Sequence, residues 1–372
     1  MVYVCDSEKC TGCKVCLETC KFGALSFVDN IEATSVEIDT EKCVRCNACK
    51  KVCQGNNAIE LAKPILWKQG WGEESVRNTS SSGGLASQIM KSFIESNGYV
   101  CSCSFRDGKF DYYITNKEDE LKQFRGSKYV KSNPDKIYSA VRKLLLKGYR
   151  VLFIGLPCHV AALKLYLHNS CEELLYTIDL ICHGTPSVKI LVDFLHENNI
   201  EINNINNILF RRKNCFDLSV DYKDIVPKGV IDRYTLGFLR GLFYTENCYH
   251  CRYAQIQRVG DLTLGDSWGT NLRDQEKYGI SLALCQTDKG IELLEKSKVT
   301  LLDVDLQTAI RENHQLKEPS SRPAKREVFF DEYLRQGSVK RAVFKCYPND
   351  CLKQAIKGLL IRFHIVRGGG KQ

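Results

Sequence analysis

Apolar residues in the middle of the chain recur with two different periods, which predict helices and strands in turn. Between residues 85 and 94 they lie three or four positions apart, as on one face of a helix that ends at Asn97-Gly98. Residues 99–105 and 110–115 are rich in aromatic and β-branched side chains and flank an Arg-Asp-Gly-Lys turn. This second pattern predicts a β-hairpin.

The alternation of elements continues along the chain. A helix is predicted over 134–147, an apolar strand over 151–155 and a second strand over 176–182, each strand leading into a further helix. Such alternation is typical of α/β proteins, whose ligands bind where parallel strands end. We therefore predict an α/β (α+β) catalytic domain with a mixed, partly parallel sheet over residues 80–334.

Ahead of this domain, eight cysteines form two copies of the spacing C-x2-C-x2-C-x3-C. Bacterial-type ferredoxins hold [4Fe-4S] clusters with this run, and the fourth cysteine of each run binds the other cluster. Zinc also binds CxxC pairs, but it does not explain a third cysteine at the same step in both copies. We predict a dicluster ferredoxin domain over 1–62 and a linker over 63–79. The predicted ligand sets are Cys10, Cys13, Cys16 and Cys53 for one cluster, and Cys43, Cys46, Cys49 and Cys20 for the other.

Both cysteine runs depart from the usual ferredoxin pattern directly after their fourth cysteine. Lys21 and Gln54 stand where a proline is usual. These departures change the loop after the ligand and remove no ligand.

The composition is that of a globular protein in a reducing compartment. A chain of 372 residues with 44% hydrophobic and 26% charged residues is long enough for about two domains and a small module. No apolar run approaches the ~20 residues of a membrane span, and no signal-peptide core precedes the first cysteines. Because cluster ligands must stay reduced, we expect a cytoplasmic protein.

The net charge of +9 is concentrated at the C-terminal end. Residues 335–372 contain nine Lys and Arg and one acid, Asp350, and their apolar residues recur at three- and four-residue steps. This pattern predicts a basic amphipathic tail helix, which either docks on the protein's own core or lies on the inner face of a membrane. No nucleic-acid-binding motif accompanies the charge, so we expect no nucleic-acid partner.

Four further cysteines are associated with the predicted α/β strands. Cys158 follows the strand over 151–155, Cys182 ends the next strand, and Cys248 and Cys251 form a CxxC pair. Four thiolates suit a third [4Fe-4S] cluster or a zinc ion. Alternatively, Cys158 and Cys182 are buried apolar residues of the core. Spacing alone leaves both interpretations open.

Several stretches around these cysteines occur in the order of a known family's motifs. GLPCHVAAL, DLICHGTPS and CYHCRYAQIQRVGDLTLGDSWG resemble the signature stretches of the family of coenzyme F420 hydrogenase and dehydrogenase beta subunits, and SSSGGLASQIM and GSKYVKS resemble its earlier blocks. The resemblance covers the chain to about Gly269. It implies an iron-sulfur flavoprotein that binds FAD, and a third cluster held by Cys158, Cys182, Cys248 and Cys251. Relatives with a fused ferredoxin module and such a tail resemble proteins linked to surface-polysaccharide biosynthesis.

A flavin also agrees with the redox chemistry, because it links a two-electron donor to one-electron clusters. The segment from Ser81 through Ser82 and Gly83 to Gly84 precedes a helix, where backbone N–H groups and the helix dipole suit a pyrophosphate. A plain serine N-cap is the alternative. Further candidates for contact with the flavin or its phosphates are Lys128, Tyr129, Lys131 and Asp266.

Two histidines are candidate catalytic residues. His159 and His183 each follow a candidate ligand, so we expect them to hydrogen-bond the cluster or flavin, or to relay a proton. A structural hydrogen bond is the alternative for both. Three cations near residue 324 either bind an anionic substrate or lie in solvent: Arg322, Lys325 and Arg326.

We therefore predict an oxidoreductase with three [4Fe-4S] clusters and FAD. It exchanges electrons with an external carrier such as ferredoxin or flavodoxin and acts on an unidentified small molecule or saccharide. The alternative is a non-catalytic electron-transfer subunit of a larger complex, including one of the F420 dehydrogenase type.

Overall fold

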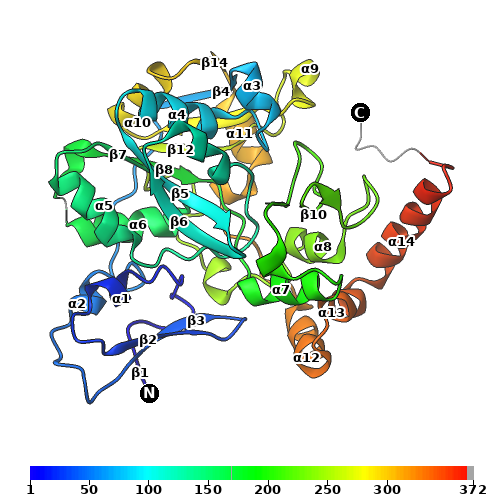
Figure 1. Ribbon diagram of the computed structural model, residues 1–372, viewed down its shortest axis with the longest axis horizontal. Coiled ribbons are helices and arrows are strands. Elements are labelled where there is room, and N and C mark those ends of the chain that lie inside the picture. The colour runs from blue at the N-terminus through cyan, green and yellow to red at the C-terminus, as the bar shows by residue number, and fades with distance from the viewer. Residues whose placement is uncertain (169, 367–372) are drawn as a thin grey trace.

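The computed structural model describes residues 1–168 and 170–366. Figure 1 shows an N-terminal module at the lower left, an α/β region above it, and a mainly helical region on the right that ends in a long helix. The end of the expected tail, residues 367–372, lies outside the described residues.

The N-terminal module is a small antiparallel sheet with two short helices. Its strands β1 (Val2–Tyr3), β2 (Leu25–Asp29) and β3 (Thr34–Ile38) pair in the order β1-β3-β2. Helices α1 (Val15–Thr19) and α2 (Ala48–Lys51) each begin inside one of the two cysteine runs. The module therefore repeats one loop-and-helix unit, as the repeated spacing predicts.

The central element of the fold is a mixed sheet of eight strands in the order β14-β4-β13-β12-β8-β7-β5-β6. Four neighbouring strands, β12, β8, β7 and β5, run parallel, and the remaining pairs are antiparallel. This confirms the predicted mixed, partly parallel α/β sheet. The strands are β4 (Leu66–Gly72), β5 (Tyr99–Arg106), β6 (Lys109–Thr115), β7 (Val151–Gly155), β8 (Leu175–Leu180), β12 (Leu262–Asp266), β13 (Ser281–Cys285) and β14 (Val299–Leu302).

Side chains alternate between the two faces of this sheet, so each face has its own core. Val151 and Phe153 of β7 pack with α5 (Ile137–Leu146), α6 (Pro157–Leu167) and the N-terminal module. Leu152 and Ile154 pack with α4 (Leu85–Glu95) and α10 (Asp288–Glu295). Both faces of β7 are buried, which is why its sequence is apolar throughout.

The helices connect and cover the sheet, and short 3₁₀ turns lie between them. Both predicted helices are present. The first ends at Glu95, shortly before the predicted Asn97-Gly98, and the second covers Ile137–Leu146 where 134–147 was predicted. The helices of the α/β region are α3 (Glu74–Asn78), α4 (Leu85–Glu95), α5 (Ile137–Leu146), α6 (Pro157–Leu167), α9 (Arg273–Glu276), α10 (Asp288–Glu295) and α11 (Leu306–Glu312), with 3₁₀ turns η1 (Glu118–Phe124), η2 (Glu172–Leu174) and η5 (His314–Leu316).

The segment 63–79, expected as a linker, lies inside the sheet instead. Its strand β4 pairs with β13 on one side and β14 on the other, and α3 follows it. A side chain at Gly70 would meet the carbonyl oxygen of Thr300 at 1.9 Å, so only glycine allows this close approach of the two strands. The segment is therefore a structural part of the α/β sheet.

A third core lies between the sheet and the C-terminal helices. It buries Phe194, Tyr234, Phe243 and Phe329 together. The first part of the expected tail over 335–372 is therefore not a separate tail, because α13 (Val339–Cys346) is buried in this core. The elements of this region are α7 (Val188–His196), η3 (Ile202–Asn204), β9 (Ile208–Leu209), β10 (Ser219–Val220), β11 (Lys223–Asp224), α8 (Arg233–Leu239), η4 (Glu246–Cys248), α12 (Arg326–Gln336), α13 (Val339–Cys346) and α14 (Pro348–Arg362).

A buried ion pair joins the end of β8 to the segment before β12. Asp179 and Arg258 are almost completely buried, and the guanidinium donates to the carboxylate at 3.0 and 3.2 Å. The other carboxylate oxygen accepts from the backbone N–H groups of Val259 and Gly260, and Arg258 also donates to Leu180 O at 2.9 Å. The pair is therefore fully hydrogen-bonded, which is the condition for burying two charges.

Helices long and apolar enough to cross a membrane do not occur within residues 1–168 and 170–366.

Replacing Arg258 with alanine is expected to lower the free energy of unfolding by about 3–5 kcal/mol, because Asp179 would stay buried without its partner. Thermal unfolding of anaerobically purified protein measures the change. The matched control is Lys296→Ala, which removes an exposed ion pair with Glu292 on α10 and is expected to cost less than about 1 kcal/mol. Equal effects of the two substitutions would contradict the role given to the buried pair.

Candidate metal and flavin site

The two cysteine runs adopt the same local backbone conformation. Gly12 and Lys14 in the first run, and Arg45 and Asn47 in the second, all have positive φ angles between 56° and 70°. Left-handed residues at alternate positions turn backbone N–H groups toward the inside of a loop, which suits an anionic cluster. The repeated spacing therefore produces a repeated loop.

The thiols of each predicted ligand set influence one another's ionisation. Burial raises the pKa of Cys16, and the neighbouring thiolates of Cys13, Cys53 and Cys10 raise it further. Burial likewise raises the pKa of Cys49, with further contributions from Cys20, Cys43 and Cys46. These mutual influences agree with the two predicted ligand sets, whose assignment stays a prediction. Within residues 1–168 and 170–366, no group of three or more His, Cys, Asp or Glu side chains is arranged to hold a single metal ion.

A fifth thiol lies beside the first set. The nearby thiol of Cys5 lowers the pKa of Cys10 to about 6 and that of Cys53 to about 7. The cysteine spacing did not indicate Cys5, because it lies outside both runs.

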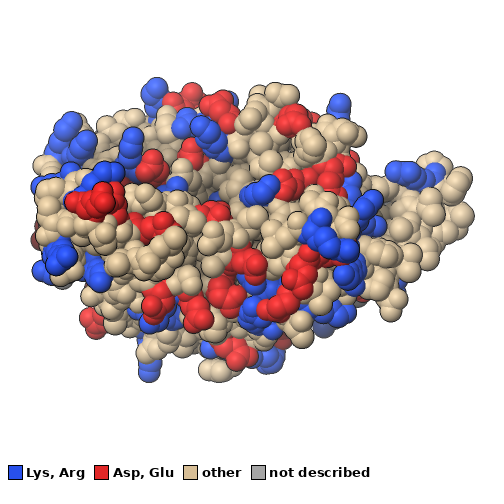
Figure 2. Space-filling model, turned by 90° about the horizontal axis from the view of Figure 1, so that it is seen from below, with Lys and Arg blue, Asp and Glu red and all other residues tan. Residues whose placement is uncertain are grey.

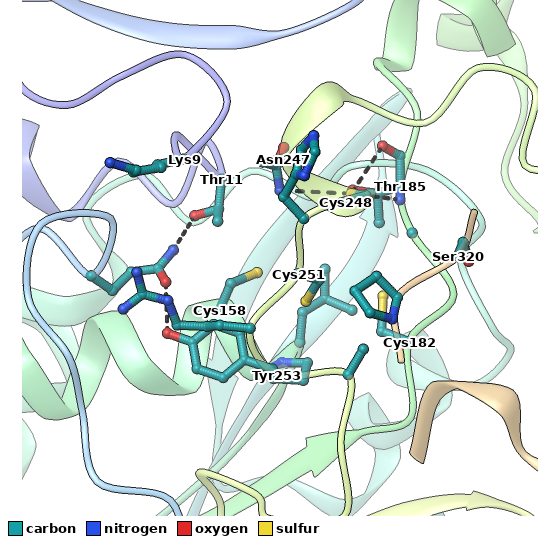
Figure 3. A pocket seen from close by; sticks show the side chains of 18 of the residues that line it. Lys9, Thr11, Cys158, Cys182, Thr185, Asn247, Cys248, Cys251, Tyr253 and Ser320 are labelled. Carbon is teal, nitrogen blue, oxygen red and sulfur yellow. Dashed lines mark hydrogen bonds between the residues drawn. The ribbon is translucent and has the colours of Figure 1, made fainter. Parts of the chain in front are cut away.

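The other four candidate ligands line a single cavity of about 360 Å³ (Figure 3). Cys158 lies at the start of α6 directly after β7, and Cys182 lies two residues after β8. Cys248 and Cys251 come from η4 and the loop that follows it. Parallel strands end at the same edge of the sheet, which brings the first two cysteines together. The interpretation of Cys158 and Cys182 as isolated core residues is therefore not favoured.

The cavity offers polar partners to sulfur. The backbone N–H of Thr185 donates to Cys248 Sγ at 3.4 Å, and Asn247 Nδ2 lies 3.6 Å from the same atom. The ring Nε2 of His159 is buried at the cavity wall and has no hydrogen-bond partner among the described residues. Burial raises the pKa of the Cys158 and Cys251 thiols. A cationic iron centre would supply the charge that thiolates need in such a place, so the residues fit a cluster.

Part of this cavity wall comes from the N-terminal module. The hydroxyl of Tyr253 donates to Gln54 Oε1 at 2.6 Å, and Gln54 Nε2 donates to Thr11 Oγ1 at 2.6 Å. Lys131 Nζ donates to Thr11 O at 2.9 Å, and Tyr138 donates to Cys13 O at 2.9 Å. The loop of the first ligand set therefore lies directly against the cavity, and Gln54 makes a contact that the usual proline could not.

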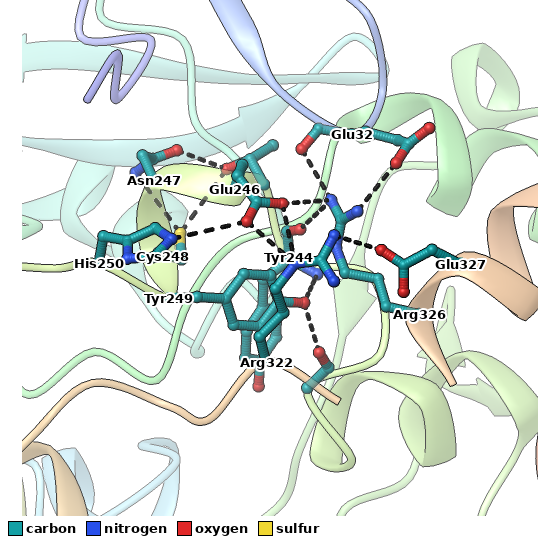
Figure 4. A network of polar contacts seen from close by, with 12 residues as sticks. Glu32, Tyr244, Glu246, Asn247, Cys248, Tyr249, His250, Arg322, Arg326 and Glu327 are labelled. Carbon is teal, nitrogen blue, oxygen red and sulfur yellow. Dashed lines mark hydrogen bonds and ion pairs between the residues drawn. The ribbon is translucent and has the colours of Figure 1, made fainter. Parts of the chain in front are cut away.

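A network of charges fixes the module at a second point (Figure 4). Buried Arg326 donates to Glu32 Oε2 at 2.8 Å and to Glu32 O at 2.9 Å, and the backbone N–H of Glu246 donates to the same carbonyl. The carboxylate of Glu246, two residues before Cys248 in the chain, also pairs with Arg322. Lys325 donates to Cys346 O. These three cations, considered for substrate binding, are thus engaged in structural contacts.

The two candidate histidines differ in their surroundings. His159 is fully buried, with Nδ1 2.8 Å from the hydroxyl of Tyr112, and burial lowers its pKa to about 3, with Lys131 adding to the shift. Desolvation at the cavity wall lowers the pKa of His183, although part of this residue is exposed, and the carboxylate of Asp266 opposes the shift. His159 therefore makes a structural hydrogen bond, whereas His183 lines the cysteine cavity and is influenced by the charge of Asp266.

A second cavity, of about 220 Å³, lies at the N-terminus of α4. Ser81, Ser82 and Gly84 line it, and Ser81 Oγ accepts from the backbone N–H of Ser127 at 3.1 Å. Sites that enclose a whole drug-sized ligand measure about 300–1,000 Å³, so this cavity fits a part of FAD such as its pyrophosphate.

The expected role of Gly83 needs correction. A Cβ atom built there would lie 2.4 Å from Gly70 O and 2.6 Å from Ser281 N. The glycine thus faces the backbone of β4 and β13, and a substitution would disturb the sheet before it could affect a phosphate.

The two candidate lysines also differ from expectation. Lys128 Nζ donates to three backbone carbonyls, those of Phe124, Arg125 and Gly126, at 2.8 to 3.1 Å. Lys131 lines the cysteine cavity and not the second one. Tyr129 between them stacks on Phe238 with ring centroids 4.4 Å apart. Backbone carbonyls thus engage both lysines, whereas Tyr129 is near Arg211 and Asp266 of the second cavity, so contact of these three residues with a flavin stays a prediction.

Arg211 is a second residue, after Cys5, that the sequence interpretation missed. Its guanidinium makes a bidentate pair with Asp266 at 2.5 and 2.6 Å, and both residues line the second cavity. Burial opposes its charged form, but the hydrogen bond and charge of Asp266 raise the pKa of Arg211 overall. The only signal in the sequence was a run of three cations, Arg211 to Lys213, after an apolar segment.

Comparisons with known proteins agree with this arrangement. Residues 148–304 match the family model for the C terminus of the coenzyme F420 hydrogenase/dehydrogenase beta subunit, and residues 9–57 match that of a 4Fe-4S dicluster domain. Residues 148–304 are thus similar to the C-terminal domain of F420 hydrogenase/dehydrogenase beta subunits. The chain is thus an iron-sulfur protein with a dicluster domain fused to the domain of this family.

Two known proteins that are similar to this chain share little sequence identity with it. One subunit of the F(420)H(2) dehydrogenase of Methanosarcina mazei is 23% identical over 137 residues, which cover 36% of this chain and only 39% of that protein. A chain of the F420-reducing [NiFe] hydrogenase complex from Methanosarcina barkeri is 15% identical with a TM-score of 0.47, covering 68% of this chain and 91% of that one.

Replacing Gly83 with alanine is expected to cost about 1–3 kcal/mol in the free energy of unfolding, because the new methyl group would overlap the backbone of β4 and β13. The control is Ala86→Ser, three residues further along at the wall of the second cavity, with little effect on stability. Thermal unfolding distinguishes the two. Native stability in the Gly83 variant would contradict the tight packing described here.

Proposed function

We propose that this protein is an iron-sulfur flavoprotein oxidoreductase that carries three [4Fe-4S] clusters and FAD. The observation that supports this proposal most is the convergence of Cys158, Cys182, Cys248 and Cys251 on one cavity whose wall includes the loop of the first ligand set. The family resemblance implies the same four ligands.

The arrangement supports an order of electron transfer. In the second ligand set Cys46 is exposed, whereas in the first set Cys10, Cys13, Cys16 and Cys53 are buried, and Cys13 lies in the core that the module shares with α5 and α6. Four exposed cations are next to or near cysteines of this set in the sequence: Lys42, Arg45, Lys50 and Lys51. An external acidic carrier such as ferredoxin or flavodoxin would exchange electrons at this surface, and the first set would relay them to the cavity.

We assign the flavin phosphates to the cavity at the start of α4. Backbone N–H groups of this helix and its dipole favour an anion there. Arg211 and Asp266 line this cavity, and their charges influence the pKa of His183, which lines the cysteine cavity. Bound FAD would exchange two electrons with a substrate and single electrons with a cluster. The residues around it would bind the cofactor, hold it beside the cysteine cavity and exclude water.

For the substrate we retain the class that the resemblance implies, a small molecule or a saccharide of a surface-polysaccharide pathway. The alternative is a non-catalytic electron-transfer subunit, which the name of the Methanosarcina mazei relative favours. Turnover of reduced F420, or of another two-electron donor, by the purified chain alone would support the enzyme over the subunit.

The iron content of the protein tests the proposed number of clusters. Anaerobically purified protein is expected to contain about twelve irons, four for each of three clusters, and replacing both Cys248 and Cys251 with serine should leave about eight. Iron and sulfide analysis measures this. The control replaces Cys171 and Cys215, which lie outside all three ligand sets, and should leave the content unchanged. An unchanged iron content in the first variant would exclude the third cluster.

A substitution at the start of α4 tests the proposed site of the flavin phosphates. Ala86 lies in the first turn of α4 at the wall of the second cavity, so Ala86→Asp adds a negative charge that favours the helix but repels phosphate. We expect FAD affinity to fall about tenfold, while Ala86→Ser retains flavin. Flavin absorbance relative to iron after gel filtration is the readout. Full flavin occupancy in the aspartate variant, with native iron content, would place the phosphates elsewhere.

A further inference from the structure

Helix α14 presents a continuous apolar stripe to solvent. Leu352, Ile356, Leu359 and Phe363 are 50, 56, 53 and 72% exposed. They are four, three and four positions apart, so they lie on one side of the helix along about 16 Å of its length. The interpretation of this stripe as a face docked on the protein's own core is therefore wrong for these residues.

The opposite side of α14 is attached to the rest of the protein. Cys351 and Gly358 are buried, and Gln354 Oε1 accepts from the backbone N–H of Ile231 at 2.9 Å. Lys357 Nζ donates to Gly229 O, and Asp350 pairs with Arg240 at 2.8 Å. These contacts fix the rotation of the helix about its axis, so that the stripe faces away from the body.

Cations border the stripe on both sides. Lys353 follows Leu352 and Arg362 precedes Phe363, which places them on opposite flanks at 100° per residue. The single acid of this helix, Asp350, is on the attached side and is engaged by Arg240. Figure 2 shows the helix as the lobe at the right-hand end, where uncharged atoms predominate and the charges that are visible are Lys and Arg.

A cavity of about 470 Å³ lies beside the same helix. Leu359 and Arg362 line it together with Arg233 and Lys340. Positive side chains thus gather where the apolar stripe meets the body of the protein.

We propose that α14 docks the protein onto an anionic lipid surface. An apolar stripe with a cation on each flank is the pattern of a helix that lies in the plane of a membrane interface, where the apolar side chains enter the acyl boundary and the cations meet lipid phosphates. This proposal is independent of the clusters and the flavin.

A second copy of the chain fits the stripe less well. Pairing two α14 helices face to face would bring Lys353 and Arg362 of each copy near the same cations of the other. The one acid on the helix is already paired, so this contact would be repulsive. Lipid phosphates satisfy both the apolar and the charged part of the surface.

The test uses the full-length protein, purified anaerobically with its cofactors, in cosedimentation with vesicles. Vesicles of phosphatidylcholine mixed with phosphatidylglycerol are compared with vesicles of phosphatidylcholine alone, each at low and at high salt. We expect binding to the anionic vesicles at low salt, and weaker binding at high salt or without the anionic lipid.

Three variants separate the contributions. Combined glutamine substitutions at Leu352, Ile356 and Leu359 should weaken binding by at least about tenfold, since they remove most of the apolar stripe. Lys353→Gln and Arg362→Gln should each weaken it about fivefold. The matched control carries glutamine at three exposed leucines outside α14 and should bind as the unmodified protein does: Leu146, Leu239 and Leu302.

Iron content and circular dichroism establish that each variant is folded, which is expected because all the altered side chains are exposed. The proposal fails if the unmodified protein does not bind anionic vesicles at low salt, or if the stripe variant binds them equally well. Sedimentation velocity provides the third outcome. A dimer that becomes a monomer in the stripe variant, without vesicle binding, would make this face a contact between copies.

Discussion

The buried pair between Asp179 and Arg258 is the constraint on which the candidate site depends. Asp179 is three residues before Cys182, and Arg258 is seven residues after Cys251, so the pair ties together two of the segments that carry the cavity thiols. Arg258 also donates to the carbonyl of Tyr253, whose hydroxyl contacts the N-terminal module through Gln54. Because two desolvated charges are costly to separate, the positions of these segments are fixed before any cofactor binds.

Much of the α/β fold could be predicted from the sequence, because its inner strands are buried on both faces. An apolar run such as residues 151–155 has few other interpretations when turns and helices flank it. Strand β4 could not be predicted in this way. Its sequence, LWKQGWG, contains two glycines and polar side chains, and it forms a strand because β13 and β14 offer it partners on both sides. Tertiary pairing here outweighs local propensity.

For the site, the sequence indicated ligand types more reliably than it indicated side-chain directions. Cysteine spacing carries geometric information, and thiols of one predicted set lie near enough to raise one another's pKa. A lysine or glycine within a stretch that resembles a family motif carries much less geometric information. Lys128 donates hydrogen bonds to carbonyl oxygens of its own loop, and Gly83 is required because the backbone of β4 and β13 lies against it. Neither contact can be inferred from the residue type. Arg211 was missed because its partner, Asp266, is 55 residues away in the chain.

The course of the chain through β4 determines how electrons can travel within the molecule. A redox module on a flexible tether moves between donor and acceptor, and the rate of electron transfer is then limited by this motion. Here the chain passes from the N-terminal module directly into a strand paired on both edges, and Arg326 holds the far hairpin of the module by Glu32. Relay through this module is therefore a fixed-distance process, and its speed depends on the potentials of the centres and on reorganisation rather than on domain motion.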